Sequence, residues 1–234
     1  PKTPSPIVIK KNKEVLEKLM MRNEKKGFSP SALSNYLECR LKFYLKHIAD
    51  IREVKEVEED LDNRIVGNLL HKTIEEFYKV VQRRKRSATI EEQDLETYKT
   101  DLPLILDKVF REHYGLHESR PVDYKGQRLV VREIVKRFAE RIVELDKEYA
   151  PFQLEALERN DLTYSINIDH APYAVSLSGI VDRADRKGNV LRVVDYKTGR
   201  DEARFKSIES LFDRSASKED KASFQTMLYA LLFS

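Results

Sequence analysis

Cysteine and long apolar runs are what this sequence has least of. Among its 234 residues the one cysteine is Cys39, so the chain by itself forms neither an internal disulfide nor a metal site of four cysteines. The sequence has no apolar run long enough to span a membrane and no signal-peptide pattern at its N-terminus. A reducing cytoplasm is therefore the expected setting, and no membrane partner is expected.

A strong charge of one sign is missing as well. The 43 basic and 40 acidic side chains leave a formal net charge of +3. This balance neither requires nor excludes a nucleic-acid partner, because the distribution of charge over the surface matters more than its sum.

The N-terminal region is expected to differ from the rest of the chain. Residues 1–28 are predicted to be a linker and a short helix, and a start without methionine indicates a fragment of a longer protein. Residues 29–234 are predicted to form one domain. Its first helix is expected to have Ser29 as its N-cap and Pro30 in its first turn.

Helices are expected first in this domain, then strands, then a helix again. Apolar spacing predicts a helix over residues 62–84 and a helical insertion over 90–150. Short apolar runs between 152 and 198 indicate strands, and the last residues again have a helical pattern. Together they predict an α/β or α+β fold with a central mixed β-sheet flanked by helices.

The stretch "SGIVDRADRKGNVLRVVDYKTG" contains an unusual pair of carboxylates. A Gly-Asn pair at 188–189 between apolar runs is typical of a two-residue type II′ hairpin loop. With this loop Lys187 pairs with Val190, and counting outward places Asp182 opposite Asp195.

Two facing aspartates at the ends of apolar strands need an explanation, since directly opposed like charges are unfavourable. A divalent cation such as Mg²⁺ bound by Asp182 and Asp195 would reverse the sign of the interaction. Lys197 shares their face, and hydrolysis of a phosphodiester uses metal-held carboxylates with a nearby lysine. A strand end that meets solvent, with Lys-Thr-Gly as a turn, is the simpler alternative, but it explains the facing aspartates poorly.

Five segments stand in a fixed order along the chain: "SPSALSNYLECRLKFYLKHI", "VGNLLHKTIEEFY", "LEALE", "SGIVDRADRKGNVLRVVDYKTG" and "FQTMLYA". Together they resemble the PD-(D/E)XK nuclease core in the version found in RecB- and AddB-type exonuclease domains. Arg40 stands where that pattern usually has proline. The resemblance spans residues 28–234, apart from the insertion over 90–150, in which no motif is recognised.

The resemblance implies a set of site residues. The implied metal ligands are His71, Asp182 and Asp195. The implied catalytic residues are Lys197, Asp195, Asp182 and Glu155, with Glu158 as a weaker candidate for the strand glutamate. Without the other motifs, His71 would be read as an ordinary helix histidine near the core.

Further residues are candidates for contact with nucleic acid. Gln225 and Tyr229 are implied by the resemblance, and because they are four residues apart they share one face of a helix. Thr198 is a candidate phosphate donor in the turn after the strand. Arg40 and Lys42 are candidate contacts to the DNA backbone, and a solvated face explains them nearly as well.

The resemblance implies a DNA exonuclease that depends on Mg²⁺ or Mn²⁺ and acts on a single strand or a duplex end. It further implies the nuclease part of a helicase–nuclease of double-strand-break repair, with a helicase domain or subunit as partner, at the nucleoid of a bacterial cytoplasm. Many such domains bind an iron–sulfur cluster through four cysteines, and with Cys39 alone no cluster is expected within this chain. The alternatives are a non-catalytic DNA-binding or scaffolding module and a helical interaction module.

Overall fold

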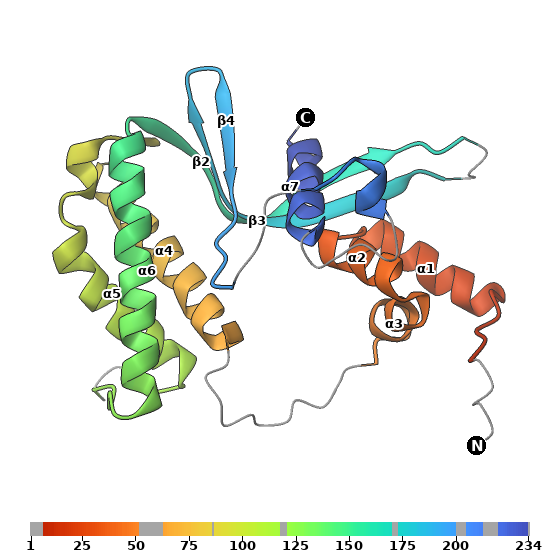
Figure 1. The fold of residues 1–234 in the computed structure, drawn as a ribbon, viewed down its shortest axis with the longest axis horizontal. Coiled ribbons are helices and arrows are strands. Elements are labelled where there is room, and N and C mark those ends of the chain that lie inside the picture. Colours follow the sequence, from red (N-terminus) through yellow and green to blue (C-terminus); the bar gives the residue numbers. More distant parts are fainter. Residues whose placement is uncertain are drawn as a thin grey trace. The chain divides into compact units, whose positions relative to one another are not determined.

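The computed structural model describes residues 7–51, 63–85, 87–117, 121–169, 173–199, 205–212 and 220–233, and its fold is drawn in Figure 1. The chain forms two compact units. Unit 1 comprises Pro1–Lys55, Asn160–Ile180 and Asp201–Ser234, and unit 2 comprises Glu56–Arg159 and Val181–Arg200. The first six residues of the expected linker lie outside the described part of the chain.

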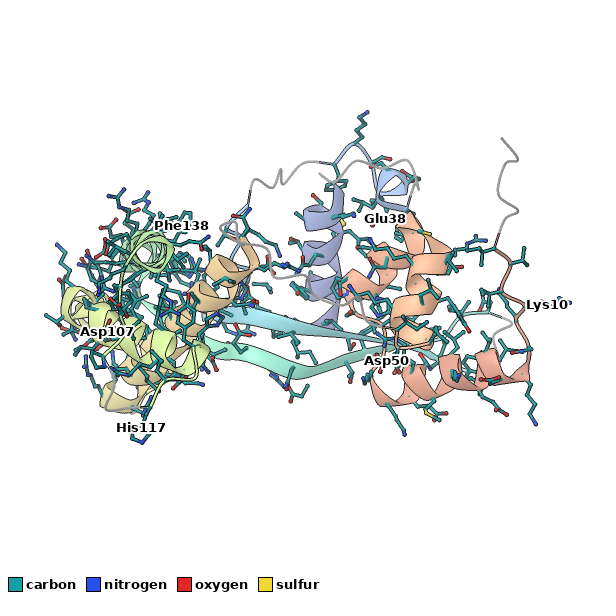
Figure 2. The ribbon with its side chains drawn as sticks, turned by 90° about the horizontal axis from the view of Figure 1, so that it is seen from below. Lys10, Glu38, Asp50, Asp107, His117 and Phe138 are labelled. Carbon is teal, nitrogen blue, oxygen red and sulfur yellow. The ribbon has the colours of Figure 1, made fainter. Side chains whose placement is uncertain are left out.

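Three long helices form the helical layer of unit 2 (Figure 1): α4 (Asn63–Lys85), α5 (Tyr98–His113) and α6 (Gln127–Tyr149). Their apolar stripes are buried against one another, with Leu69, Phe77 and Phe110 at 1% exposure or less. Phe138 on α6 lies outside this core and is 41% exposed (Figure 2). The helix predicted over 62–84 and the helical insertion are confirmed. Both could be predicted because their apolar positions recur with the 3.6-residue period of a helix.

The sheet has four strands in the order β1-β2-β3-β4. Their bounds are Thr89–Ile90, Phe152–Ile166, Val175–Lys187 and Val190–Val194. The expected mixture of helices and sheet is confirmed, with two differences in detail. The pairs β1/β2 and β3/β4 are antiparallel, and among the described residues a parallel pairing occurs as an isolated bridge between Phe28 and Leu177. A short hairpin can join only antiparallel strands, whereas a parallel pair needs a long crossover.

The second difference concerns the origin of the strands. The strand β1 lies between α4 and α5 rather than within the strand-rich region after residue 150. With two residues, it is too short to produce a visible alternation of apolar and polar positions.

Unit 1 contains shorter helices. They are α1 (Lys13–Lys25), α2 (Pro30–Glu38), α3 (Arg40–Phe43), the π-helical turn Tyr44–Ile48, the 3₁₀ turn Glu209–Phe212 and α7 (Asp220–Leu232). Ser29 caps α2 as predicted, since its side chain accepts a hydrogen bond from the backbone N–H of Ala32. The helical pattern of this region is broken at Cys39, whose φ of −156° and ψ of 113° are extended.

In unit 1, α7 packs closely against β3. A Cβ atom added at Gly179 would lie 2.7 Å from Cδ1 of Leu232 and 3.0 Å from Cε1 of Tyr229. On the N-terminal side, Asn23 of α1 donates to the carbonyl of Ala174 and accepts from the N–H of Ser176. The missing side chain at Gly179 therefore permits α7 to lie this close to β3. Within the described part of the chain, no helix is both long and apolar enough to cross a bilayer.

Candidate active site

The hairpin of β3 and β4 places the two aspartates as the sequence predicts. Its loop is the Gly-Asn pair at 188–189, and Lys187 pairs with Val190. Gly188 has φ +58°, and the φ of Asn189 is not positive. This combination is that of a type II′ turn. The ladder has five residue pairs and ends with Arg183 opposite Val194; continued by one position, the same register brings Asp182 opposite Asp195. The predicted register is confirmed.

The main chain of Tyr196 holds two candidate site residues. Its N–H donates to Oδ2 of Asp182 over 2.7 Å, and its carbonyl oxygen lies 2.8 Å from Nε2 of His71. The Tyr196 side chain is 7% exposed, and its ring meets the ring of His71 edge to face, with centroids 5.8 Å apart. One residue thus fixes a carboxylate from β3 and an imidazole from α4.

These contacts determine which nitrogen of His71 carries a proton. A carbonyl oxygen can only accept, so Nε2 must donate its proton to Tyr196. The other nitrogen, Nδ1, faces Oδ1 of Asp182 at 3.3 Å and Oε1 of Glu158 at 3.6 Å. Metal-binding histidines characteristically donate their second N–H to a carbonyl or carboxylate, which orients the ring toward the ion.

Glu158 joins this group through an unusual backbone conformation. It has φ +45° inside β2, a region that side chains other than glycine rarely adopt. Such residues cost about 1–3 kcal/mol and cluster at functional sites. The ligand atoms of His71, Glu158 and Asp182 all lie within 4.8 Å of one another. Among the described residues these three make the group that could hold a metal ion.

The structure does not bring Glu155 to this group. Its carboxylate accepts a hydrogen bond from Nε of Arg186 at 2.7 Å. In β2, Phe152, Leu154 and Ala156 are buried and Glu155 is exposed, so Glu155 is on the opposite face of the strand. The alternation of buried residues would have favoured Glu158 in the sequence, since it shares their parity.

Asp195 and Lys197 are in direct contact with each other. Nζ of Lys197 lies 2.7 Å from Oδ2 of Asp195, and the two side chains are 41% and 19% exposed. Asp195 is not in the close three-residue group, although it is near enough to His71 and Asp182 to interact electrostatically with both. Of the three predicted ligands, His71 and Asp182 lie in the close group, Glu158 takes the third place there, and Asp195 lies at its margin.

Burial and charge shift the pKa values of this group in opposite ways. Burial alone would lower the pKa of His71, but its contacts with Asp182 and Glu158 dominate and raise it to about 10. Burial raises the pKa of Asp195, the contact with Lys197 opposes this shift, and the charge of Asp182 adds to it. The group therefore has an excess of negative charge that a cation or a proton on His71 compensates.

The donor set fits a divalent ion with a preference for oxygen. Two carboxylates and one imidazole nitrogen point to a common region, a combination suited to Mg²⁺ or Mn²⁺. The outer hydrogen bonds that orient metal ligands are present as well, since the main chain of Tyr196 binds both His71 and Asp182.

Comparison with known proteins identifies the family. The family model of the PD-(D/E)XK nuclease superfamily matches residues 27–234. The chain belongs to this superfamily. It is also 27% identical over 186 residues to an ATP-dependent helicase/deoxyribonuclease subunit of Carboxydothermus hydrogenoformans. The match covers 74% of this chain and 16% of that protein, so the chain spans about a sixth of the length of this relative.

Thr198 continues the PD-(D/E)XK core segment beyond Lys197. Its Oγ1 lies 3.6 Å from the position that a Cβ atom on Gly67 would take. Gly67 is one turn before His71 on α4, so the Thr198 turn lies next to this helix, at a distance that is an ordinary van der Waals contact for an added Cβ. The role of Thr198 as a phosphate donor stays a prediction.

The expected nucleic-acid contacts from α7 differ from each other in exposure. Tyr229 is 5% exposed, and its hydroxyl accepts a hydrogen bond from Nε2 of Gln225 at 2.7 Å. The shared helix face is confirmed. Because the Tyr229 ring packs beside Gly179 in unit 1, it is a core residue that orients the Gln225 amide, and Gln225 is the better candidate for a direct contact.

The two basic candidates on α3 are exposed. The guanidinium of Arg40 lies 5.7 Å from the centre of the Tyr36 ring. Lys42 is paired with Glu38 at 3.2 Å, and Glu38 is also paired with Lys221 of α7. Pairing with Glu38 reduces the charge that Lys42 offers, so Arg40 is the stronger candidate for contact with a DNA backbone.

Proposed function

We propose that this chain is a DNA exonuclease domain that depends on Mg²⁺ or Mn²⁺ and hydrolyses phosphodiester bonds. Its partners would be a DNA single strand or duplex end and a helicase domain or subunit. The setting would be double-strand-break repair at the nucleoid of a bacterial cytoplasm. The nuclease superfamily and the similarity to a helicase/deoxyribonuclease subunit support this proposal.

The observation that carries the proposal is the orientation of His71. Its Nε2–H is committed to the Tyr196 carbonyl, so Nδ1 faces Asp182 and Glu158 with its lone pair when the ring is neutral. A lone pair directed at two carboxylates is unfavourable unless a cation lies between them. In the absence of metal a proton on Nδ1 meets this need, since the contacts with Asp182 and Glu158 raise the pKa of His71 to about 10, and a divalent ion can take the place of that proton.

His71, Asp182 and Glu158 would hold the ion, with Asp195 beside them. A bound divalent ion neutralises charge on a scissile phosphate and lowers the pKa of a water molecule. Lys197 is 41% exposed beside Asp195, where its ammonium group can stabilise the charge that develops on the phosphate in the transition state. Gln225 and Arg40 are the proposed contacts that hold the DNA strand.

The test is the release of nucleotides from end-labelled single-stranded and duplex DNA, with Mg²⁺, with Mn²⁺ and with EDTA. We expect metal-dependent release that Asp182→Asn abolishes. DNA binding without release in any metal would instead favour the alternative, a non-catalytic DNA-binding or scaffolding module with the same fold. Release that EDTA and Asp182→Asn leave unchanged would contradict the metal site.

A further inference from the structure

A group of four buried or half-buried charges adjoins the candidate site in unit 2. Its members are Asp146 of α6, Arg183 and Asp185 of β3, and Arg192 of β4. Arg183, Asp146 and Asp185 are 1%, 3% and 0% exposed. None of the four is among the site residues that the sequence predicts, and α6 belongs to the insertion in which no motif is recognised.

The carboxylate of Asp146 is the centre of this group. Arg183 donates to it with both terminal nitrogens, over 2.6 and 2.7 Å. The hydroxyl of Tyr78 donates to Oδ2 over 2.6 Å, and Arg192 donates to Oδ1 over 3.0 Å. One side chain from α6 thus binds β3, α4 and β4 at the same time.

These three elements are the ones that carry the principal site residues. Tyr78 is seven residues after His71 on α4, Arg183 directly follows Asp182 on β3, and Arg192 is three residues before Asp195. A shift of any of the three elements would therefore have to break a hydrogen bond to Asp146.

Asp185 closes the group from the other side. Arg192 donates to both of its oxygens over 2.8 Å, and Nε of Arg183 lies 3.1 Å from Oδ2. Two cations and two anions balance one another, so the group has no net charge to leave uncompensated. Arg192 also stacks on Tyr149 of α6, with its guanidinium carbon 3.7 Å from the ring centre.

Stability alone is a weak reason for such a group. Removing ions from water is costly, and well-packed apolar residues in their place often leave a protein as stable or more stable. What apolar residues cannot supply is direction, since the planar guanidinium of arginine fixes the angle and distance of each carboxylate.

We propose that Asp146 is a positioning residue for the candidate metal site, a role that rests on the proposed nuclease function. It sets the distances between His71, Asp182 and Asp195 through Tyr78, Arg183 and Arg192. The helical insertion then has a role in the site, because its helix α6 carries Asp146.

The experiment compares two matched pairs of variants in the 234-residue chain. Asp146→Asn removes the charge at the centre of the group, and Arg192→Lys keeps its charge but loses the planar fork. The controls are Asp101→Asn and Arg84→Lys, because Arg84 also donates to both oxygens of a largely buried aspartate, Asp101. That control pair joins α4 to α5 rather than a helix to strands.

Two measurements follow folding and positioning separately. Calorimetric titration with Mn²⁺ gives the metal affinity of the folded protein, well below its unfolding temperature. Hydrogen exchange of the Tyr196 amide in EDTA reports whether Asp182 still holds that N–H. Outer contacts of metal ligands typically change affinity by about 10–100-fold, so we expect a loss in this range for Asp146→Asn and a smaller loss for Arg192→Lys. Exchange at Tyr196 should become faster in both.

Asp101→Asn and Arg84→Lys should lower the unfolding temperature yet leave Mn²⁺ affinity and Tyr196 exchange unchanged. Equal losses in the site variants and their controls would overturn the positioning role. If Asp146→Asn does not fold, Arg192→Lys against Arg84→Lys decides the question. A parent chain that cleaves DNA and whose metal affinity Asp146→Asn and Arg192→Lys leave intact overturns only this inference. A parent that neither binds Mn²⁺ nor cleaves overturns the proposed function as well.

Discussion

The Nε2–H of His71 donates a hydrogen bond to the carbonyl oxygen of Tyr196 over 2.8 Å. The two residues are 125 positions apart, and the bond joins the middle of α4 to the segment that follows β4. It leaves Nδ1 as the one ring nitrogen directed at the carboxylates of Asp182 and Glu158. Protons and metal ions must therefore compete for the same nitrogen.

Without divalent ions, the free energy of unfolding should fall as the pH rises toward about 10. In the folded protein the pKa of His71 is raised from 6.5 to about 10. A group with a raised folded-state pKa contributes stability that is complete below its unfolded pKa and is lost as the pH rises through the folded one. The stability difference between the parent and His71→Gln, measured by urea unfolding in EDTA, should therefore shrink between about pH 6.5 and about pH 10.

The exposed His113 of α5 provides the control. His113→Gln should differ from the parent by a small amount, because exposed substitutions away from special features usually change stability by less than about 0.5 kcal/mol. A stability difference for His71→Gln that stays constant with pH would show that its imidazolium is not stabilised by the neighbouring carboxylates.

The two glutamates of β2 should separate in metal binding. Glu158→Gln removes one of the three clustered ligands. It should weaken Mn²⁺ binding by at least about tenfold, because the loss of a direct ligand should cost at least as much as the loss of an outer contact. Glu155→Gln breaks the exposed pair with Arg186 and should change the affinity by less than about twofold, because exposed pairs contribute little. Calorimetric titration measures both, and the reverse ranking would return the metal site to Glu155.

Packing in unit 1 can be tested at Gly179. A new Cβ would come within 3.0 Å of the Tyr229 ring and closer still to Leu232, so Gly179→Ala should destabilise by about 1–3 kcal/mol, as overpacked cores do. Gly199→Ala is the comparison, because no described atom lies within 4 Å of the added Cβ. Urea unfolding of the two variants should separate them, and equal stabilities would mean that α7 does not approach β3 this closely.

Local patterns were enough to predict part of the site. A two-residue Gly-Asn loop sets the register of a hairpin, and this register placed Asp182 opposite Asp195. The apolar period of α4 placed His71 on a helix at the edge of its buried stripe. Both inferences depend on residues that are close in the sequence.

The remainder depends on contacts between distant segments. The alternation in β2 puts Glu158 on the parity of the buried residues, but no propensity predicts the positive φ that this glutamate adopts within the strand. Asp146 and Arg183 are 37 residues apart, and a charge on an amphipathic helix ordinarily indicates a solvated face. The resemblance implies Tyr229 as a nucleic-acid contact, and the spacing to Gln225 shows only a shared helix face; the burial of Tyr229 follows from the close approach permitted at Gly179.

The last prediction concerns Lys197 and divides catalysis from binding. If its ammonium group stabilises charge that develops only in the transition state, its loss should reduce kcat far more than DNA affinity. Lys197→Ala should lower the rate by about 10²–10³-fold, as expected for one such contact, while the affinity for a labelled DNA end stays near that of the parent. Lys125→Ala is the matched control, because this side chain is 85% exposed and lies outside the site.

Gln225→Ala should show the opposite division, with most of its defect in DNA affinity and less in kcat, since a contact made equally in ground and transition states lowers binding without slowing the chemical step. The measurements are single-turnover cleavage with Mg²⁺ and fluorescence anisotropy with Ca²⁺ in its place. Each rate is compared with that of the parent in the same assay, from which the proposed helicase partner is absent. Cleavage that survives Lys197→Ala at the parental rate would show that Lys197 neutralises Asp195 and has no part in the chemistry.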